Sequence, residues 1–134
     1  MCQEEDAKTR SAAAGALAMM TSNDHFAEKI CSLIAESTEN WIECLAMVCL
    51  DYEASVRHRG VVVIQNISKN SQKLAAKLAE SNMKEILSGM ARDMEISWGE
   101  GMINDRKNRD FLKNLCQNVL DLWLDYGIIS INQS

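Results

Sequence analysis

The sequence predicts an all-α fold, a superhelical solenoid of stacked three-helix repeats, and three observations predict it. The 134 residues contain no proline, although average usage would give about six or seven. Apolar residues recur at helical spacing through most of the chain, which is the main sequence signal of amphipathic helices. The pattern that begins at Thr9 also returns 47 residues later at Val56, a period typical of helical repeat proteins.

The composition indicates one globular domain and excludes several function classes. Hydrophobic residues make up 47% and charged residues 25% of the chain, as in ordinary globular domains. The net charge of −5 argues against a nucleic-acid module, which carries a basic excess. No apolar run reaches the length of a membrane span. The five irregularly spaced cysteines predict no disulfide framework, and they predict a reducing compartment, the cytosol.

The first two helices are expected on either side of a polar break. Residues 21–24 read Thr-Ser-Asn-Asp, which supplies both a stop and an N-cap for the following helix. One helix is therefore expected over 5–20 and the next over 24–36. Their inward stripes are expected at Ala13, Ala16, Leu17 and Met20, then at Phe26, Ile30, Leu33 and Ile34.

A third helix is expected over 37–50 and a fourth over 52–67. Ser37 and Thr38 can cap the third. The fourth has apolar residues on one continuous helical face, and the polar run 68–71 is expected to end it. The inward stripes are Trp41, Cys44, Leu45, Val48 and Cys49, then Val56, Gly60, Val63, Ile64 and Ile67.

Three further helices are expected over 71–80, 81–94 and 105–126. The segment 95–104 contains Gly99 and Gly101 and is interpreted as a loop. Gly127 is well placed to end the last helix. The expected inward residues are Leu74, Leu78, Met83, Ile86, Leu87, Met90, Met94, Leu112, Leu115, Val119, Leu122 and Tyr126, widened by Phe111, Cys116 and Trp123.

The repeat divides the chain into units of the armadillo or HEAT type, whose period is about 40–47 residues. A second step of 47 residues from Val56 reaches Ile103, near the expected start of the last helix. We therefore expect an orphan third helix at 1–22, a repeat at 23–69, a terminal repeat at 70–127 and a tail at 128–134. Glycines at 15 and 60 would let neighbouring helices approach closely, which offsets their entropic penalty.

Several segments resemble the family of myosin-directed chaperones that carry a UCS domain, and the resemblance covers nearly the whole chain. They are Ser55-Val56-Arg57-His58-Arg59-Gly60-Val61-Val62-Val63, Lys73-Leu74-Ala75-Ala76-Lys77-Leu78-Ala79-Glu80-Ser81 and Asp125-Tyr126-Gly127-Ile128-Ile129. The resemblance places the chain at the C-terminal end of such a protein. The segment 94–108, which includes Trp98, departs from the family pattern and is interpreted as an insertion.

The resemblance implies a non-enzymatic chaperone that binds and helps to fold the myosin head, with myosin filament assembly as the result. It also implies a cytoplasmic, sarcomere-associated protein and a second partner, the ninety-kilodalton heat-shock chaperone. That partner docks on a tetratricopeptide domain, which nothing in this chain matches. The orphan first helix leaves self-association open as well.

The candidate partner-binding residues lie on the fourth expected helix. Third helices line the groove of an armadillo stack, and an asparagine late in that helix contacts the bound chain in peptide-binding members; Asn66 matches that position. An amide can both donate and accept hydrogen bonds. The buried stripe leaves the other side of the helix for a partner or for solvent. The candidates are His58, Arg59, Val62, Gln65, Asn66 and Lys69, to which Trp98 in the loop is added as a candidate aromatic contact.

Each candidate also has a purely structural interpretation. The polar face of the helix expected over 52–67 could simply be solvated, and Trp98 could fold back onto the last helix. No catalytic residues, metal ligands or cofactor motif are expected, because the histidines lie in different repeats and no Cys-x-x-Cys pair exists. Two other functions stay open: a structural end-cap of the solenoid, which needs a polar outer face, and an armadillo adaptor for an unrelated cargo.

Overall fold

The computed structural model describes residues 7–36 and 41–130, and all regular structure within these ranges is helical. The all-α prediction is therefore confirmed for this part of the chain. None of the described helices is both long enough and apolar enough to span a bilayer. The elements are α1 (Ala7–Ser22), α2 (Asp24–Glu36), α3 (Trp41–Cys49), α4 (Ala54–Asn70), α5 (Gln72–Glu80), α6 (Met83–Ala91), the 3-10 turn η2 (Glu95–Ser97), α7 (Gly99–Met102) and α8 (Arg106–Asp125).

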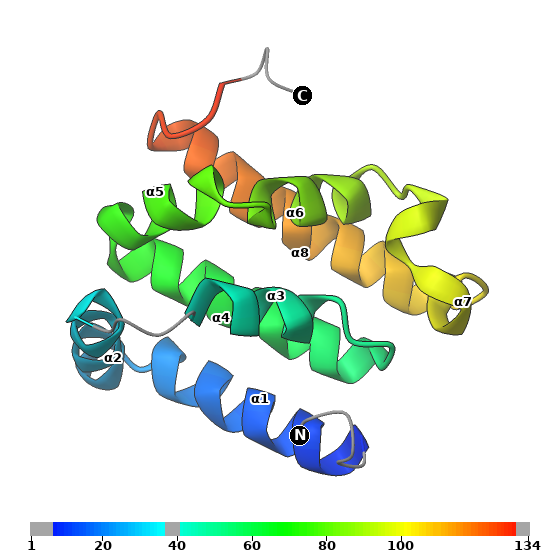
Figure 1. Ribbon diagram of the computed structural model, residues 1–134, viewed down its shortest axis with the longest axis horizontal. Coiled ribbons are helices and arrows are strands. Elements are labelled where there is room, and N and C mark those ends of the chain that lie inside the picture. The colour runs from blue at the N-terminus through cyan, green and yellow to red at the C-terminus, as the bar shows by residue number, and fades with distance from the viewer. Residues whose placement is uncertain (1–6, 37–40, 131–134) are drawn as a thin grey trace.

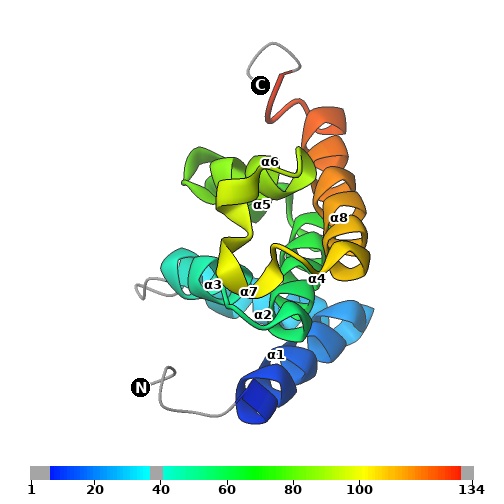
Figure 2. The same cartoon turned by 90° about the vertical axis from the view of Figure 1, so that its right-hand side faces the viewer.

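The three longest helices, α1, α4 and α8, run side by side in the same direction (Figure 1). Figure 2 shows them along one side of the molecule, with α2, α3, α5 and α6 on the other. Helix α4 is the middle member, because it packs against both α1 and α8. This two-layer arrangement is compatible with the predicted armadillo-type solenoid.

The spacing between equivalent helices differs between the two steps. Helix α4 begins 47 residues after α1, at Ala54 against Ala7, but α8 begins at Arg106, which is 52 residues after Ala54. The buried positions of the two helices also match at an offset of 52 residues. Ile64 and Ile67 of α4 then correspond to Cys116 and Val119 of α8, and all four side chains are 0–1% exposed. The second 47-residue step to Ile103 is therefore wrong by about one helical turn. The segment that contains η2 and α7 supplies the additional residues.

Polar side chains mark several helix boundaries. Helix α4 continues through the predicted break to Asn70; within that break Ser68 is buried, and its Oγ accepts a 2.9 Å hydrogen bond from Trp123 Nε1. Ser71 caps the start of α5, because its Oγ accepts from the Leu74 backbone N–H. The last helix is capped by Asp105, which accepts from the Asn108 N–H. Gly127, at φ 77°, ends that helix as expected.

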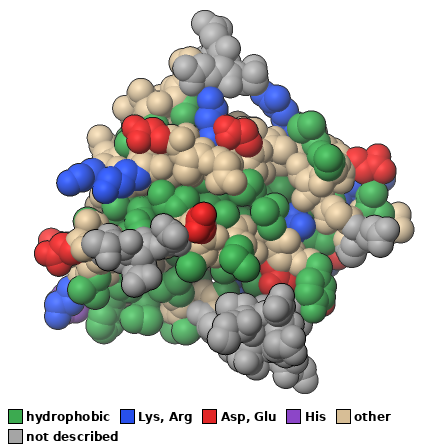
Figure 3. All heavy atoms as spheres, in the orientation of Figure 1, with side chains coloured by type: hydrophobic (Ala, Val, Ile, Leu, Met, Phe, Trp, Pro, Cys, Tyr) green, Lys and Arg blue, Asp and Glu red, His purple; other side chains and the backbone are tan. Residues whose placement is uncertain are grey.

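Several residues expected in the core lie at the surface. Helix α2 turns Ala27, Cys31 and Ile34 inward, because α1 and α4 pack against that side alone. In Figure 3 hydrophobic side chains gather over α2 and α3, where Leu33 and Met47 are each 67% exposed. The predicted inward positions that prove exposed are Ala16, Leu17, Met20, Phe26, Leu33, Cys44, Met94 and Phe111.

Other expectations fall outside the described residues. They concern Cys2, the helix start at Glu5, the caps Ser37 and Thr38, and the tail end 131–134. The segment 95–104, expected as a loop, is partly helical: it contains η2 and the single turn α7, which packs on α8.

Gly60 provides a test of the close packing between α3 and α4. A Cβ at this position would lie 2.7 Å from Val48 Cγ1 and 3.4 Å from the Cys49 backbone nitrogen. We expect Gly60→Ala to lower the free energy of unfolding by about 1–3 kcal/mol, as overpacking does. Urea unfolding followed by circular dichroism measures this.

Gly15→Ala is the matched control. Its Cβ would meet the Arg59 guanidinium, with Nη1 2.6 Å away, and that flexible end can move aside. Alanine is also the better helix former by about 0.5–1 kcal/mol, so we expect little loss of stability. Equal destabilisation by the two substitutions would contradict the close approach at Gly60.

Candidate functional site

A surface hollow lies between the N-terminal halves of α4 and α8. Its volume is about 320 Å³, and it is lined by Ala54, Ser55, His58, Arg59, Asn108, Phe111 and Leu112. The walls come from two helices whose starts are 52 residues apart in the sequence, so the stacking of α4 on α8 creates the hollow. We call it the α4–α8 groove.

One wall of the groove is an aromatic contact between the helices. The imidazole of His58 meets the ring of Phe111 edge to face, with centroids 4.8 Å apart and planes at 78°. Phe111 remains 58% exposed, so its ring forms an accessible apolar surface. Phenylalanine is among the aromatic residues that are enriched in protein–protein interfaces.

His58 is held toward its neutral form. Burial lowers its pKa from the ordinary value of 6.5, and the neighbouring positive charge of Arg59 lowers the pKa further. Neutral imidazole can donate at one ring nitrogen and accept at the other. The groove therefore combines an apolar ring, a neutral polar ring and a guanidinium group.

Arg59 bridges the groove and α1. Its guanidinium lies against Gly15 of α1, where a side chain would collide with it. Arg59 therefore contacts α1 as well as lining the groove.

Asn66 holds two helices together. Its Nδ2 donates to the Ala18 carbonyl oxygen at 3.2 Å and to Thr21 Oγ1 at 3.1 Å. Both acceptors belong to α1, so this amide is already engaged within the chain. A contact from Asn66 to a bound peptide would have to exchange these bonds or use the amide oxygen.

The remaining candidates are three residues of α4 outside the groove lining and one core residue. Val62 and Gln65 are partly exposed on α4, and Lys69 is exposed near its end. Trp98 is 1% exposed, and its Nε1 donates to Asp93 Oδ1 at 2.8 Å. Trp98 therefore lies in the core and does not join the groove surface.

Of the seven residues that line the groove, the sequence analysis proposed only His58 and Arg59 as contacts. Phe111 and Leu112 were assigned to the core, and Ala54, Ser55 and Asn108 were not proposed as contacts. The informative signal is the longer repeat step, because Phe111 lies 52 residues after Arg59 and so occupies the equivalent position in α8. The 47-residue step conceals this relation.

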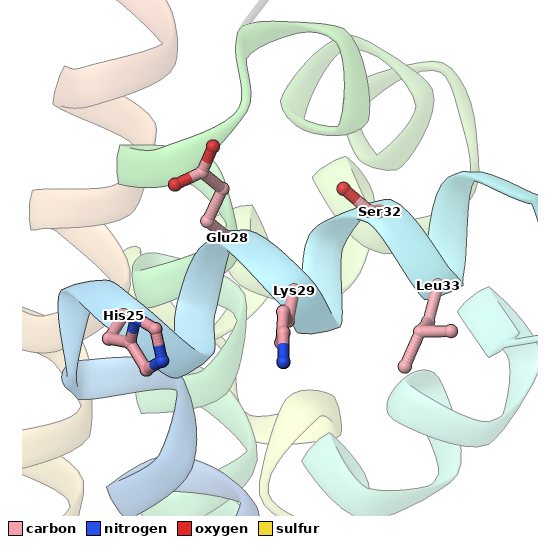
Figure 4. Close-up of a pocket in the computed structure, with 5 residues that line it drawn as sticks. All are labelled: His25, Glu28, Lys29, Ser32 and Leu33. Carbon is pink, nitrogen blue, oxygen red and sulfur yellow. The ribbon is translucent and has the colours of Figure 1, made fainter.

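A second hollow, of about 470 Å³, lies on the outer side of α2 and is lined by His25, Glu28, Lys29, Ser32 and Leu33. In Figure 4 the side chains of His25, Lys29 and Leu33 point to one side of the helix, and Glu28 points away from them. All of its described walls come from one helix. It therefore lacks the two-helix definition of the α4–α8 groove.

The described residues contain no metal centre, and two of their cysteines are deeply buried. No group of three or more metal-ligating side chains occurs among them. Cys49 and Cys116 are fully buried; burial raises the pKa of both thiols, that of Cys116 to about 12. A thiol held protonated is a poor nucleophile.

Comparisons with known proteins give one consistent result. The chain is 36% identical over 130 residues to protein unc-45 homolog B of Xenopus tropicalis and 42% identical over 129 residues to that of Homo sapiens. Each alignment covers 96% of this chain, but only 13% and 12% of the relatives. The chain thus spans about an eighth of their length. No family model matches, and no solved structure matches significantly.

The titration of His58 tests the geometry of the groove. We expect a pKa below the unfolded value of about 6.5, and we expect Phe111→Ala to raise it by opening the site to water. Nuclear magnetic resonance titration of the imidazole Cε1 proton measures both values. A His58 pKa that is unchanged by loss of the ring would contradict the contact.

The same shift has a consequence for stability. A lowered pKa in the folded chain means that the unfolded chain binds more protons just below pH 6.5, so stability falls as pH decreases through the folded pKa. We expect His58→Gln to lose this part of the pH dependence. Urea unfolding at a series of pH values measures it, and identical pH profiles would contradict the assignment.

Proposed function

This chain belongs to the UNC-45 family by homology to UNC-45 homolog B, and on that premise we propose that it is a non-enzymatic module that binds the myosin motor domain and assists its folding. The single observation that carries this proposal is the α4–α8 groove, where an exposed aromatic ring lies beside His58 and Arg59. The resemblance of the sequence to myosin-directed chaperones supplies the identity of the client.

The groove suits a partly folded client. Phe111 offers apolar surface, and Arg59, which also has an interaction within the chain, adds positive charge to the groove. Val62, Gln65 and Lys69 extend the same face of α4 beyond the groove. A client segment with an apolar side chain next to an acidic one would match these contacts.

The proposal includes the wider organisation of the protein. We propose that residues 1–22 are a third helix, that 23–69 and 70–127 are repeats, and that the ninety-kilodalton heat-shock chaperone binds through a domain outside these 134 residues. The proposed location is the cytoplasm, at the site of sarcomere assembly.

A second function, a structural end-cap, has its own supporting observation. Ile128 and Ile129 follow Gly127 back onto the core, and the Ile128 N–H donates to the Trp123 carbonyl at 3.0 Å. This fold-back covers apolar surface at the α5–α8 end. Helix α5 also presents Gln72, Lys73, Lys77 and Glu80 to solvent, and a terminal repeat needs such a polar outer face.

Heat aggregation of a myosin motor domain distinguishes the two functions. We expect the 134-residue chain to suppress aggregation, and we expect Phe111→Asp to reduce that suppression and to weaken binding at least about tenfold, because a charge replaces the central apolar contact. Light scattering measures suppression, and fluorescence anisotropy measures the dissociation constant.

Leu33→Asp is the control, because Leu33 is similarly exposed but lies on α2. Circular dichroism should show both variants folded. Aggregation curves that superimpose with and without the chain would rule out the chaperone function and favour the end-cap.

A further inference from the structure

The turn between α6 and α7 exposes apolar side chains although its backbone is firmly held. Ile96 is 87% exposed, which is the largest exposure among the large hydrophobic residues described, and Met94 is 47% exposed. Between them lies the exposed Glu95. We call residues 93–98 the Ile96 turn. Exposing such residues without a partner gains nothing for folding.

A buried arginine anchors this turn. Arg57 of α4 is 4% exposed, and its Nη1 donates to the Ser97 carbonyl at 2.8 Å, while its Nη2 donates to the Trp98 carbonyl at 3.3 Å. Its Nε donates to the Asp51 carbonyl at 2.6 Å. Burying a charge carries a desolvation penalty. The hydrogen bonds of Arg57 to the Ser97 and Trp98 carbonyls fix the backbone of the turn.

A strained aspartate fixes the other end of the turn. Asp93 has φ 57°, a left-handed conformation in which glycine is the usual residue. Its carboxylate accepts from Trp98 Nε1 at 2.8 Å, and it lies 3.6 Å from Arg109 and 3.8 Å from Lys113 of α8. The contacts of its carboxylate with these three partners compensate the backbone strain. A glycine would avoid the strain, but it would make none of these contacts.

A close backbone approach completes the anchoring. A Cβ at Gly89 of α6 would collide with Ser97 Oγ, so the turn lies directly on α6. The Met94 N–H also donates to the Gly89 carbonyl at 3.0 Å. Locally unfavourable features of this kind cluster at functional sites. Here the buried arginine, the strained aspartate and the close approach to Gly89 all hold one turn. That turn exposes Met94, Glu95 and Ile96 to solvent.

The turn lies at the same end of the helices as the α4–α8 groove. Figure 1 shows α7, which follows the turn directly, beside the N-terminal ends of α4 and α8. Arg57 and His58 are successive residues of α4, and the first holds the turn while the second lines the groove. The turn and the groove are therefore connected through neighbouring residues of α4.

We propose that the Ile96 turn is a pre-organised docking contact for the same client, and that it inserts Ile96 into an apolar pocket of the motor domain that has a cationic rim facing Glu95. The inference rests on the proposed function for the identity of that client. A rigid contact loses little conformational entropy on binding, which gives the anchoring by Arg57 and Asp93 a use. The cationic rim follows from charge complementarity, because Glu95 is the charged neighbour of Ile96.

Binding of the 134-residue chain to a purified myosin motor domain tests the inference. We expect Ile96→Asp to raise the dissociation constant at least about tenfold, with Ile96→Leu close to wild type. We expect Glu95→Lys to raise it about three- to tenfold. Leu33→Asp and Glu85→Lys are the matched controls, since both residues are exposed and lie outside the turn. Circular dichroism verifies folding of each variant.

The outcomes separate the inference from the function on which it rests. If the wild-type chain does not bind the motor domain, both the proposed function and this inference fail. If it binds and Ile96→Asp binds equally well, the inference alone is overturned. If Ile96→Asp weakens binding but Glu95→Lys strengthens it, the pocket is apolar with an anionic rim, and the proposed partner chemistry is wrong.

Discussion

Helix α4 is packed on both flanks, by α1 on one side and α8 on the other, and the rest of the structure depends on this packing. Ile64 and Ile67 are buried on the face toward the shorter helices. Polar bonds fix the flanks: Asn66 donates to α1, and Ser68 accepts from Trp123 of α8. A helix with apolar residues on so much of its surface is stable only when it is buried on several sides.

Both candidate contact surfaces follow from this position of α4. The groove exists because α8 lies beside α4 at a step of 52 residues, which brings Phe111 against His58. The Ile96 turn occupies the segment that lengthens the step, and Arg57 of α4 holds it. The segment that departs from regular repetition is therefore joined to the groove by adjacent side chains of one helix.

Much of the fold could be predicted from the sequence because helix spacing is a local signal. The stripe of α4 and the end of α8 at Gly127 depend on neighbouring residues, and both predictions hold. The exposure of Phe26 and Leu33 could not be predicted, because the apolar spacing of α2 does not reveal which side α1 and α4 cover.

The site was less predictable for the same reason. The apolar stripe of α4 predicts that His58 and Arg59 lie on the opposite side of the helix. The contact of His58 with Phe111, however, depends on the register between α4 and α8, which lie far apart in the sequence. The Asn66 bond to α1 and the buried charge of Arg57 likewise depend on contacts more than 30 residues away in the sequence. Sequence periodicity carries little information about such pairs.

Native-state amide hydrogen exchange tests the central position of α4 most directly. Core helices open only with global unfolding, whereas peripheral ones open locally at lower free energy. The account predicts that amides of Val61–Ile67 exchange with the full free energy of unfolding measured by urea, and that amides of α2 exchange at clearly lower values. Exchange of Val61–Ile67 at the low values of α2 would show that α4 is not held on both flanks, and would contradict the account.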